Sequence, residues 1–255
     1  MNDQGLEKNV AFYALRLADS ALTMGQRIAE WCGHGPYLEE DVALTNVSLD
    51  YFGHANMLYS VAAELLDDGR SADQLAFLRD VHEFKNPILT ELPKGDFGYT
   101  MLKQYFMDCF NSYLYQALLQ SNHQALSDIA AKAIKEVKYH KDRSELWVKR
   151  LAMGTEESRT RMQRSLDDLW FYTPELFETN AIIDALIQDK IAADPQTFKT
   201  AWQQEVEGLL KTCSLQLPET GWVATGGLKG EHSEHLGYML AEMQFLQRAY
   251  PGCEW

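Results

Sequence analysis

Four long stretches of this chain carry helical signals, and they fall into two consecutive pairs. They cover residues 6–31, 37–66, 99–120 and 125–153. Apolar residues recur at helical spacing in the first stretch, and the fourth is rich in the helix formers Ala, Lys and Glu. The segments Gly33–Pro36 and Asp67–Gly69 end the first two stretches. The pattern predicts an all-α fold that contains two long helical hairpins.

Shorter helical segments are expected around and after these hairpins. One lies at 72–81, and Thr155 is placed to cap a helix that runs to about 177 and that Pro174 kinks or shortens. Two more are expected at 197–215, after Asp194-Pro195, and at 231–250. Because no low-complexity tract or proline-rich linker divides the chain, we expect a single domain over 1–255. Its core would cover about 6–153, with wrapping helices at about 155–250.

Composition narrows the classes of partner. The chain has 255 residues, is 46% hydrophobic and carries a formal net charge of -14. This charge opposes binding to nucleic acid. The amino end, Met1–Gly5, lacks the features of a signal peptide, and no apolar stretch approaches the length of a membrane span. We therefore expect a cytoplasmic protein with no membrane or nucleic-acid partner.

The four cysteines give no sign of a zinc ribbon or a disulfide framework. They are scattered along the chain and form no Cys-x-x-Cys pair. We expect buried free thiols at Cys32, Cys109, Cys213 and Cys253.

Two short motifs, one in the second helix of each pair, are the most informative chemical feature. Tyr51–His54 and Val137–His140 each keep the histidine of a Glu-x-x-His signature but lack its glutamate. In ferritin-like four-helix bundles, this signature occurs once in each half and binds a shared pair of metal ions. A phenol and an isopropyl group cannot replace the carboxylates that two irons require. The sequence therefore predicts a ferritin-like bundle with a vestigial di-iron site and no catalytic residue.

Few other ligands are available for that site. Asp108 lies about a hairpin's length before Val137, and the corresponding part of the first helix offers only Asp19. Tyr51, His54, Asp108, Val137 and His140 thus make up the predicted remnant. One alternative is a mononuclear iron enzyme in which His54, Asp108 and His140 form a facial triad. Another is that both histidines are ordinary helix residues satisfied by their neighbours.

Two acidic residues precede the lost glutamate positions. In intact sites, a carboxylate beside the metal ligands accepts the other N–H of a ligand histidine. Asp50 and Glu136 are placed for this role. We hypothesise that they form a hydrogen-bonded network with His54, His140 and Asp108 where metal would otherwise bind.

Three further patterns are less specific. His232–His235 either binds a metal ion through its two histidines or, more simply, forms the polar start of the last helix. Thr225–Gly230 lacks the spacing of a phosphate loop. A basic cluster could face an acidic partner or coenzyme A phosphates, although a solvated helix face is the simpler interpretation. The cluster consists of Lys132, Lys135, Lys138, Lys141, Arg143, Lys149 and Arg150.

Four blocks in this order resemble the C subunits of bacterial phenylacetyl-CoA epoxygenases over nearly the whole chain. The blocks are Glu30–His34, Leu49–His54, Ala131–His140 and His232–Gln244. The resemblance implies a non-catalytic, ferritin-like structural subunit in phenylacetate degradation. A general ferritin-like binding or stress protein is the alternative that rests on the fold alone.

The resemblance also implies partners and cofactors. A homologous catalytic A subunit would hold the di-iron site, a small B subunit would bridge the heterodimers, and a reductase would use NADPH, FAD and an iron-sulfur cluster. This chain itself would bind no cofactor. When it is alone, an exposed interface would favour a homodimer.

Overall fold

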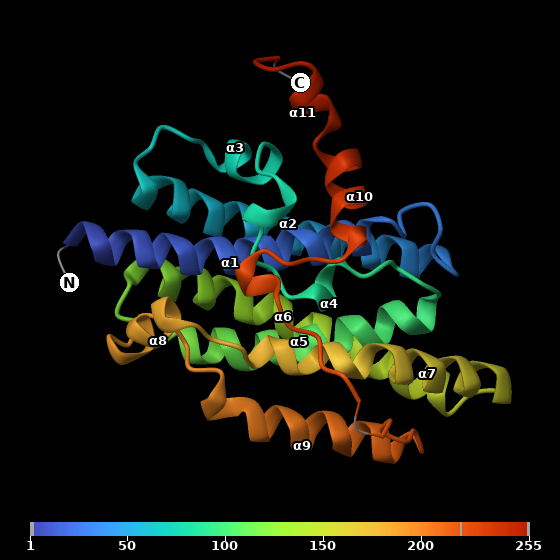
Figure 1. Ribbon diagram of the computed structural model, residues 1–255. Coiled ribbons are helices and arrows are strands. Elements are labelled where there is room, and N and C mark those ends of the chain that lie inside the picture. The colour runs from blue at the N-terminus through green and yellow to red at the C-terminus, as the bar shows by residue number, and fades with distance from the viewer. Residues whose placement is uncertain (1–2, 220, 254–255) are drawn as a thin grey trace. The chain divides into compact units, whose positions relative to one another are not determined.

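The computed structural model describes residues 3–219 and 221–253, and within these ranges the chain is helical and contains no β-strand (Figure 1). The all-α prediction is therefore confirmed. Met1 and Asn2, part of the amino end discussed above, lie outside the described residues. In the part that is described, no helix is both long enough and apolar enough to cross a bilayer.

The chain divides into two compact units, and each contains one of the two long helical pairs. Unit 1 consists of Met1–Pro93, Asn180–Leu186 and Thr225–Trp255, and unit 2 of Lys94–Thr179 and Ile187–Ala224. These two pairs are the two hairpins that a ferritin-like bundle contains. The expectation of a single domain remains a prediction.

In unit 1, α1 (Asp3–Ala29) packs along α2 (Leu38–Leu66). Gly25 allows this close packing, since a Cβ atom there would lie 2.8 Å from the ring of Phe52. The unit also contains α3 (Ala72–Phe77), η1 (Val81–Glu83), α4 (Ile88–Glu91), η3 (Gly227–Lys229), α10 (Glu234–Met243) and α11 (Phe245–Ala249). Most of α8 (Ala181–Gln188) belongs to it as well.

In unit 2, α5 (Phe97–Leu118) packs along α6 (Gln124–Ala152). Also in this unit are α7 (Glu156–Leu169), η2 (Trp170–Phe177) and α9 (Gln196–Thr212). Trp202 of α9 is 1% exposed, packs against the rings of Phe106 and Phe177, and donates its indole N–H to the carbonyl of Phe106. Aromatic packing thus fixes α9 against α5.

Three of the expected helices begin, change or divide at identifiable residues. The side chain of Thr155 accepts a hydrogen bond from the N–H of Ser158, which confirms the expected start of α7. The helix becomes 3₁₀ at Trp170, close to Pro174, whose ring cannot donate to an α-helical ladder. At the other end of the chain, the helix expected at 231–250 is divided into α10 and α11 at Gln244.

The cysteine prediction is wrong for two of the four residues. Cys109 and Cys213 are buried, whereas Cys32 and Cys253 are exposed. Cys32 follows the end of α1 and Cys253 follows α11, so both lie in segments that leave the packed helices.

Candidate functional site

The first motif lies inside unit 1. Tyr51 and His54 are one helical turn apart on α2, each is only 1% exposed, and their ring centroids are 6.2 Å apart in an edge-to-face arrangement. Asp50, on the same helix, is half-buried. The helix therefore places the predicted ligand histidine in the interior, next to a phenol in place of the expected carboxylate.

Asp19, the one carboxylate expected from the first helix, is fully buried but already engaged. Its Oδ1 accepts from the hydroxyl of Tyr59 at 2.6 Å and from the guanidinium of Arg79. Its Oδ2 accepts from Nη1 of Arg79 at 3.2 Å and from the backbone N–H of Lys85 at 2.8 Å. Burial and the neighbouring Asp19 charge raise the pKa of Tyr59, so Tyr59 remains a donor. Asp19 is thus held by groups of unit 1 through both oxygens.

The second motif lies inside unit 2. Asp108 on α5 and Val137 and His140 on α6 all have an exposure of 0%. The hydroxyl of Ser144, one turn after His140, donates to Oδ2 of Asp108 at 2.9 Å. In unit 2, a hydrogen bond between a carboxylate and a hydroxyl therefore joins α5 to α6. His140 and Val137 are also buried on α6.

These donor sets do not fit a pair of irons. Val137 has no donor atom, Tyr51 offers a phenol instead of a carboxylate, and both oxygens of Asp19 accept hydrogen bonds from other groups. Within residues 3–219 and 221–253, no group of three or more His, Cys, Asp or Glu side chains could hold a metal ion. The hypothesised network of Asp50, His54, Asp108, Glu136 and His140 includes residues of both units and remains a prediction.

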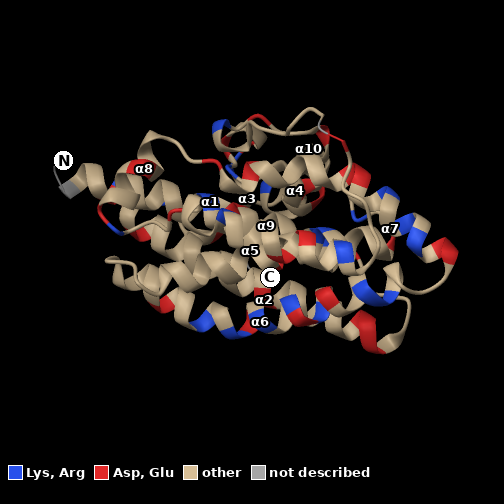
Figure 2. Ribbon diagram, turned by 90° about the horizontal axis from the view of Figure 1, so that it is seen from below, with Lys and Arg blue, Asp and Glu red and all other residues tan. Residues whose placement is uncertain are grey.

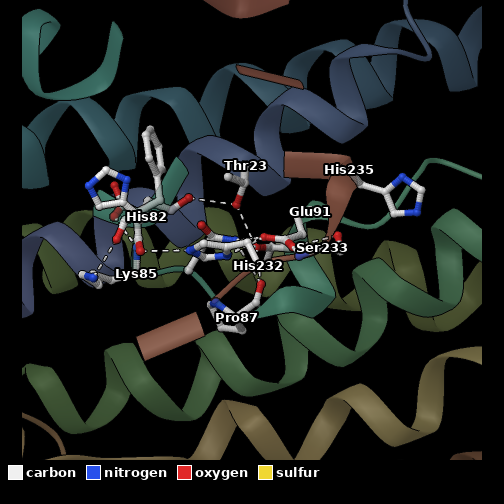
Figure 3. A network of polar contacts seen from close by, with 12 residues as sticks. Thr23, His82, Lys85, Pro87, Glu91, His232, Ser233 and His235 are labelled. Carbon is white, nitrogen blue, oxygen red and sulfur yellow. Dashed lines mark hydrogen bonds and ion pairs between the residues drawn. The ribbon is translucent and has the colours of Figure 1, made fainter. Parts of the chain in front are cut away.

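A polar cluster that the sequence did not predict is centred on Glu91, at the end of α4 (Figure 3). One carboxylate oxygen of Glu91 lies 2.8 Å from Nδ1 of His232 and accepts from Nδ2 of Asn86 at 3.0 Å. The other accepts from the backbone N–H and the hydroxyl of Ser233, at 2.7 and 2.8 Å. In addition, Arg27 of α1 donates to the carbonyl of Glu91. Glu91 thus ties the segment before α10 to α1 and α4.

The surroundings of His232 in this cluster favour its protonated form. Its side chain is fully buried, with Nδ1 against the Glu91 carboxylate and Nε2 2.9 Å from the carbonyl of Phe84. Both partners can accept a hydrogen bond, which favours a ring that carries a proton on each nitrogen. Burial alone would lower the pKa of His232, but the hydrogen bond and charge of Glu91 outweigh it and raise the pKa.

The two histidines of His232–His235 do not bind a metal together. His235 points away from Glu91 in Figure 3, whereas His232 points toward it.

Gly230, just before this segment, has a φ of +83°, and a Cβ there would lie 2.0 Å from the carbonyl oxygen of His82. A glycine is therefore needed for the chain to pass this close to η1.

Three of the seven basic residues of the cluster on α6 form ion pairs within unit 2. Lys138 pairs with Asp142, Lys141 with Glu205, and Lys149 with Glu145. Arg143 is buried, and basic residues alternate with acidic ones along α6 (Figure 2). Alternating charges are typical of a solvated helix face, and binding of an acidic partner or of coenzyme A phosphates remains a prediction.

Comparison with known proteins shows the family of this chain. Residues 1–255 match the family described as "Phenylacetic acid catabolic protein", and the chain belongs to this family. It is similar to the C subunit of the 1,2-phenylacetyl-CoA epoxidase of Escherichia coli (strain K12), with 46% identity over 243 residues. The match covers 95% of this chain and 98% of that protein. The resemblance found in the four sequence blocks is confirmed.

Proposed function

We propose that this chain is the C-type subunit of a multicomponent phenylacetyl-CoA epoxidase and that it has a structural, non-catalytic role. Its similarity to the C subunit of the E. coli enzyme supports the assignment to such a complex. The observation that carries the non-catalytic role is Val137, a fully buried residue without a donor atom at a position where a di-iron site needs a carboxylate.

The proposal extends to the partners and to the pathway. A homologous A subunit holds the di-iron centre and performs the epoxidation, a small B subunit bridges the heterodimers, and a reductase with NADPH, FAD and an iron-sulfur cluster supplies electrons. The complex acts in phenylacetate degradation in the cytoplasm. This chain contributes a rigid helical partner that keeps the catalytic bundle in its active form.

Reconstitution tests this function. The A-type subunit is purified with and without this chain, and epoxidation of phenylacetyl-CoA is measured with the reductase. We expect turnover only when both chains are present, and no turnover by this chain with the reductase alone. Turnover by this chain alone would refute a structural role.

Two separate measurements test the alternatives. Iron analysis of the chain purified from iron-rich medium tests the mononuclear site of His54, Asp108 and His140, which requires one tightly bound iron per chain. Sedimentation at several concentrations tests the homodimer of the isolated chain, and a monomer at every concentration would refute it.

A further inference from the structure

The last segment of unit 1, residues 225–253 and here called the strap, contains η3, α10 and α11. Four large apolar side chains are buried in this segment, which the structure describes in full: Leu228, Leu236, Met239 and Leu240. The final helix, α11, buries no residue. A terminal segment with so few buried apolar contacts opens more readily than a packed helical pair such as α1 and α2. How often the strap opens therefore depends on its polar contacts.

Polar contacts hold the strap at both ends of α10. After this helix, Gln244 donates to two backbone carbonyls near the end of α3, and Arg248 pairs with Asp80. Before it, His232 meets Glu91 of α4 (Figure 3). The side chains of Arg248 and Asp80 are 43% and 64% exposed, whereas those of His232 and Glu91 are both fully buried. Because water screens the exposed pair, the buried contacts before α10 are the main polar attachment.

The carboxylate of Glu91 depends on the strap for its hydrogen bonds. Nδ1 of His232 lies 2.8 Å from one oxygen, and the N–H and hydroxyl of Ser233 donate to the other at 2.7 and 2.8 Å. Of the described groups outside the strap, the amide of Asn86 alone donates to this carboxylate, at 3.0 Å. Closing the strap therefore buries the carboxylate and supplies three of its four hydrogen bonds.

The charge of His232 sets the strength of this attachment. A protonated ring donates both to the Glu91 carboxylate and to the carbonyl of Phe84, whereas a neutral ring donates to one of them. The neutral ring also loses its attraction to the charge of Glu91. Protonation of His232 therefore favours the closed strap, and the raised pKa of His232 reflects the same coupling.

The other charged and titratable groups near His232 lie on α1, α4 and the strap and in or beside η1. They are Asp19, Arg27, His82, Lys85, Glu91, Glu231 and His235. Glu91 and Asp19 favour the protonated ring of His232, and burial lowers the pKa of Lys85. Among the three histidines, which titrate nearest to neutral pH, His232 is the one that contacts Glu91. Its proton is therefore the one that is coupled to closure.

We propose that the strap is a pH-sensitive lid of unit 1: protonated His232 holds it closed on Glu91, and loss of this proton makes it open more often while α1 and α2 stay packed. Opening exposes the Glu91 carboxylate and the apolar side chains of α10. The contribution of the proton is complete below the usual histidine pKa of about 6.5 and is lost as the pH rises through the raised pKa of His232. The lid is a property of this chain alone, whether or not the proposed function holds.

Native-state hydrogen exchange of the full chain measures how often the strap opens, after correction for the intrinsic exchange rate at each pH. Amides of Glu234–Met243 report on the strap, and those of residues 10–24 report on α1. We expect the strap to open at least about tenfold more often than α1 at every pH. From about pH 6 to about pH 9, its opening should rise about tenfold for each unit by which closure raises the pKa of His232. Equal opening of the strap and α1, or strap opening that does not change with pH, would overturn the proposal.

Two variants assign the pH dependence to a single histidine. His232→Gln keeps a side chain that can donate to Glu91 but does not titrate, so its strap should open equally often at both ends of the pH range. His235→Gln is the matched control, because His235 lies on the same strap and points away from Glu91 (Figure 3). This control should retain the pH dependence of the wild type. The proposal fails if His232→Gln retains that dependence or if His235→Gln loses it.

A third variant keeps the proposal testable if His232→Gln does not fold. Glu91→Gln removes the charge that raises the pKa of His232, and its amide oxygen can still accept from Ser233. Protection of the α1 amides shows whether each variant is folded. We expect strap opening in Glu91→Gln to be nearly independent of pH. An unchanged pH dependence would show that the pair of His232 and Glu91 does not control the lid.

Discussion

Units 1 and 2 each bury one aspartate on the first helix of their long pair, and they stabilise it differently. In unit 1, Asp19 is compensated by a cation, the guanidinium of Arg79, and is also held by Tyr59. In unit 2, Asp108 accepts a hydrogen bond from a neutral hydroxyl, that of Ser144. In both units, donors of the protein itself bind a carboxylate inside a helical pair.

One further ion pair from each unit also differs in burial. In unit 1, His232 and Glu91 meet with both side chains fully buried. In unit 2, Lys141 and Glu205 meet with side chains that are 19% and 28% exposed, and the hydroxyl of Tyr113 also donates to Glu205. These two ion pairs of unit 1 are thus more deeply buried than the Lys141–Glu205 pair of unit 2, and the four predictions that follow test what the polar contacts of each unit contribute.

The largest effect is expected from Arg79→Met. Loss of the guanidinium would leave the charge of Asp19 buried without its cation, and we expect the free energy of unfolding to fall by about 3–5 kcal/mol. Urea denaturation measures this free energy of unfolding. The double variant Asp19→Leu/Arg79→Met should lose less than the single one, because it removes both charges. Arg70→Met is the control, because it removes the cation of an exposed pair with Asp68. If Arg79→Met lowers the free energy of unfolding by no more than this control, the role given to Arg79 is wrong.

A smaller loss is expected from Ser144→Ala in unit 2. The variant removes the hydroxyl that donates to Asp108, and we expect a loss of about 1–2 kcal/mol in the same denaturation experiment. Ser60→Ala is the control, because the hydroxyl of Ser60 donates only to the carbonyl of Asn56 at an exposed site. Equal stability of the two variants would show that this bond does not hold α5 to α6.

Glu205→Gln should have a still smaller effect, about 1 kcal/mol or less, because the pair is partly solvated. Burial opposes ionisation of Glu205, but Lys141 and Tyr113 outweigh it and lower the pKa. A lowered pKa stabilises the folded state above the pKa of the unfolded chain, and this contribution is lost as the pH falls through the folded value. The stability difference between wild type and variant should therefore shrink in acid. A difference that grows in acid would contradict this assignment.

The last prediction concerns how stability changes with pH, and at His232 this change has the opposite sign. Its raised pKa stabilises the folded state fully below the usual histidine value of about 6.5, and this contribution is lost as the pH rises through the folded value. A neutral His232 ring still donates one of its two hydrogen bonds, so only part of the stabilisation is lost. The stability difference between wild type and His232→Gln should shrink as the pH rises, and a constant difference would show that His232 is uncharged.

Local sequence signals predicted the long helices well. Apolar spacing and caps such as Thr155 act within one or two turns, so the four main helices begin and end within a few residues of their predicted limits. The short helices α4 and α8 were missed, because four to eight residues carry too little periodicity to be recognised.

The polar contacts were less predictable from the sequence. The motifs pointed to buried histidines on α2 and α6, and both histidines are buried. The facing of Asp19 and the meeting of Glu91 with His232 depend on how distant segments fold back on one another, and no local pattern encodes them.

Iron content is the most direct test of the central claim, that this chain holds no di-iron centre and that the oxygen chemistry belongs to another subunit. The chain is expressed in iron-rich medium, purified without chelators and analysed for bound metal. We predict less than about 0.1 iron per chain, because Val137 and Tyr51 supply no carboxylate. A stoichiometric pair of irons, with the spectrum of a bridged centre, would contradict this claim.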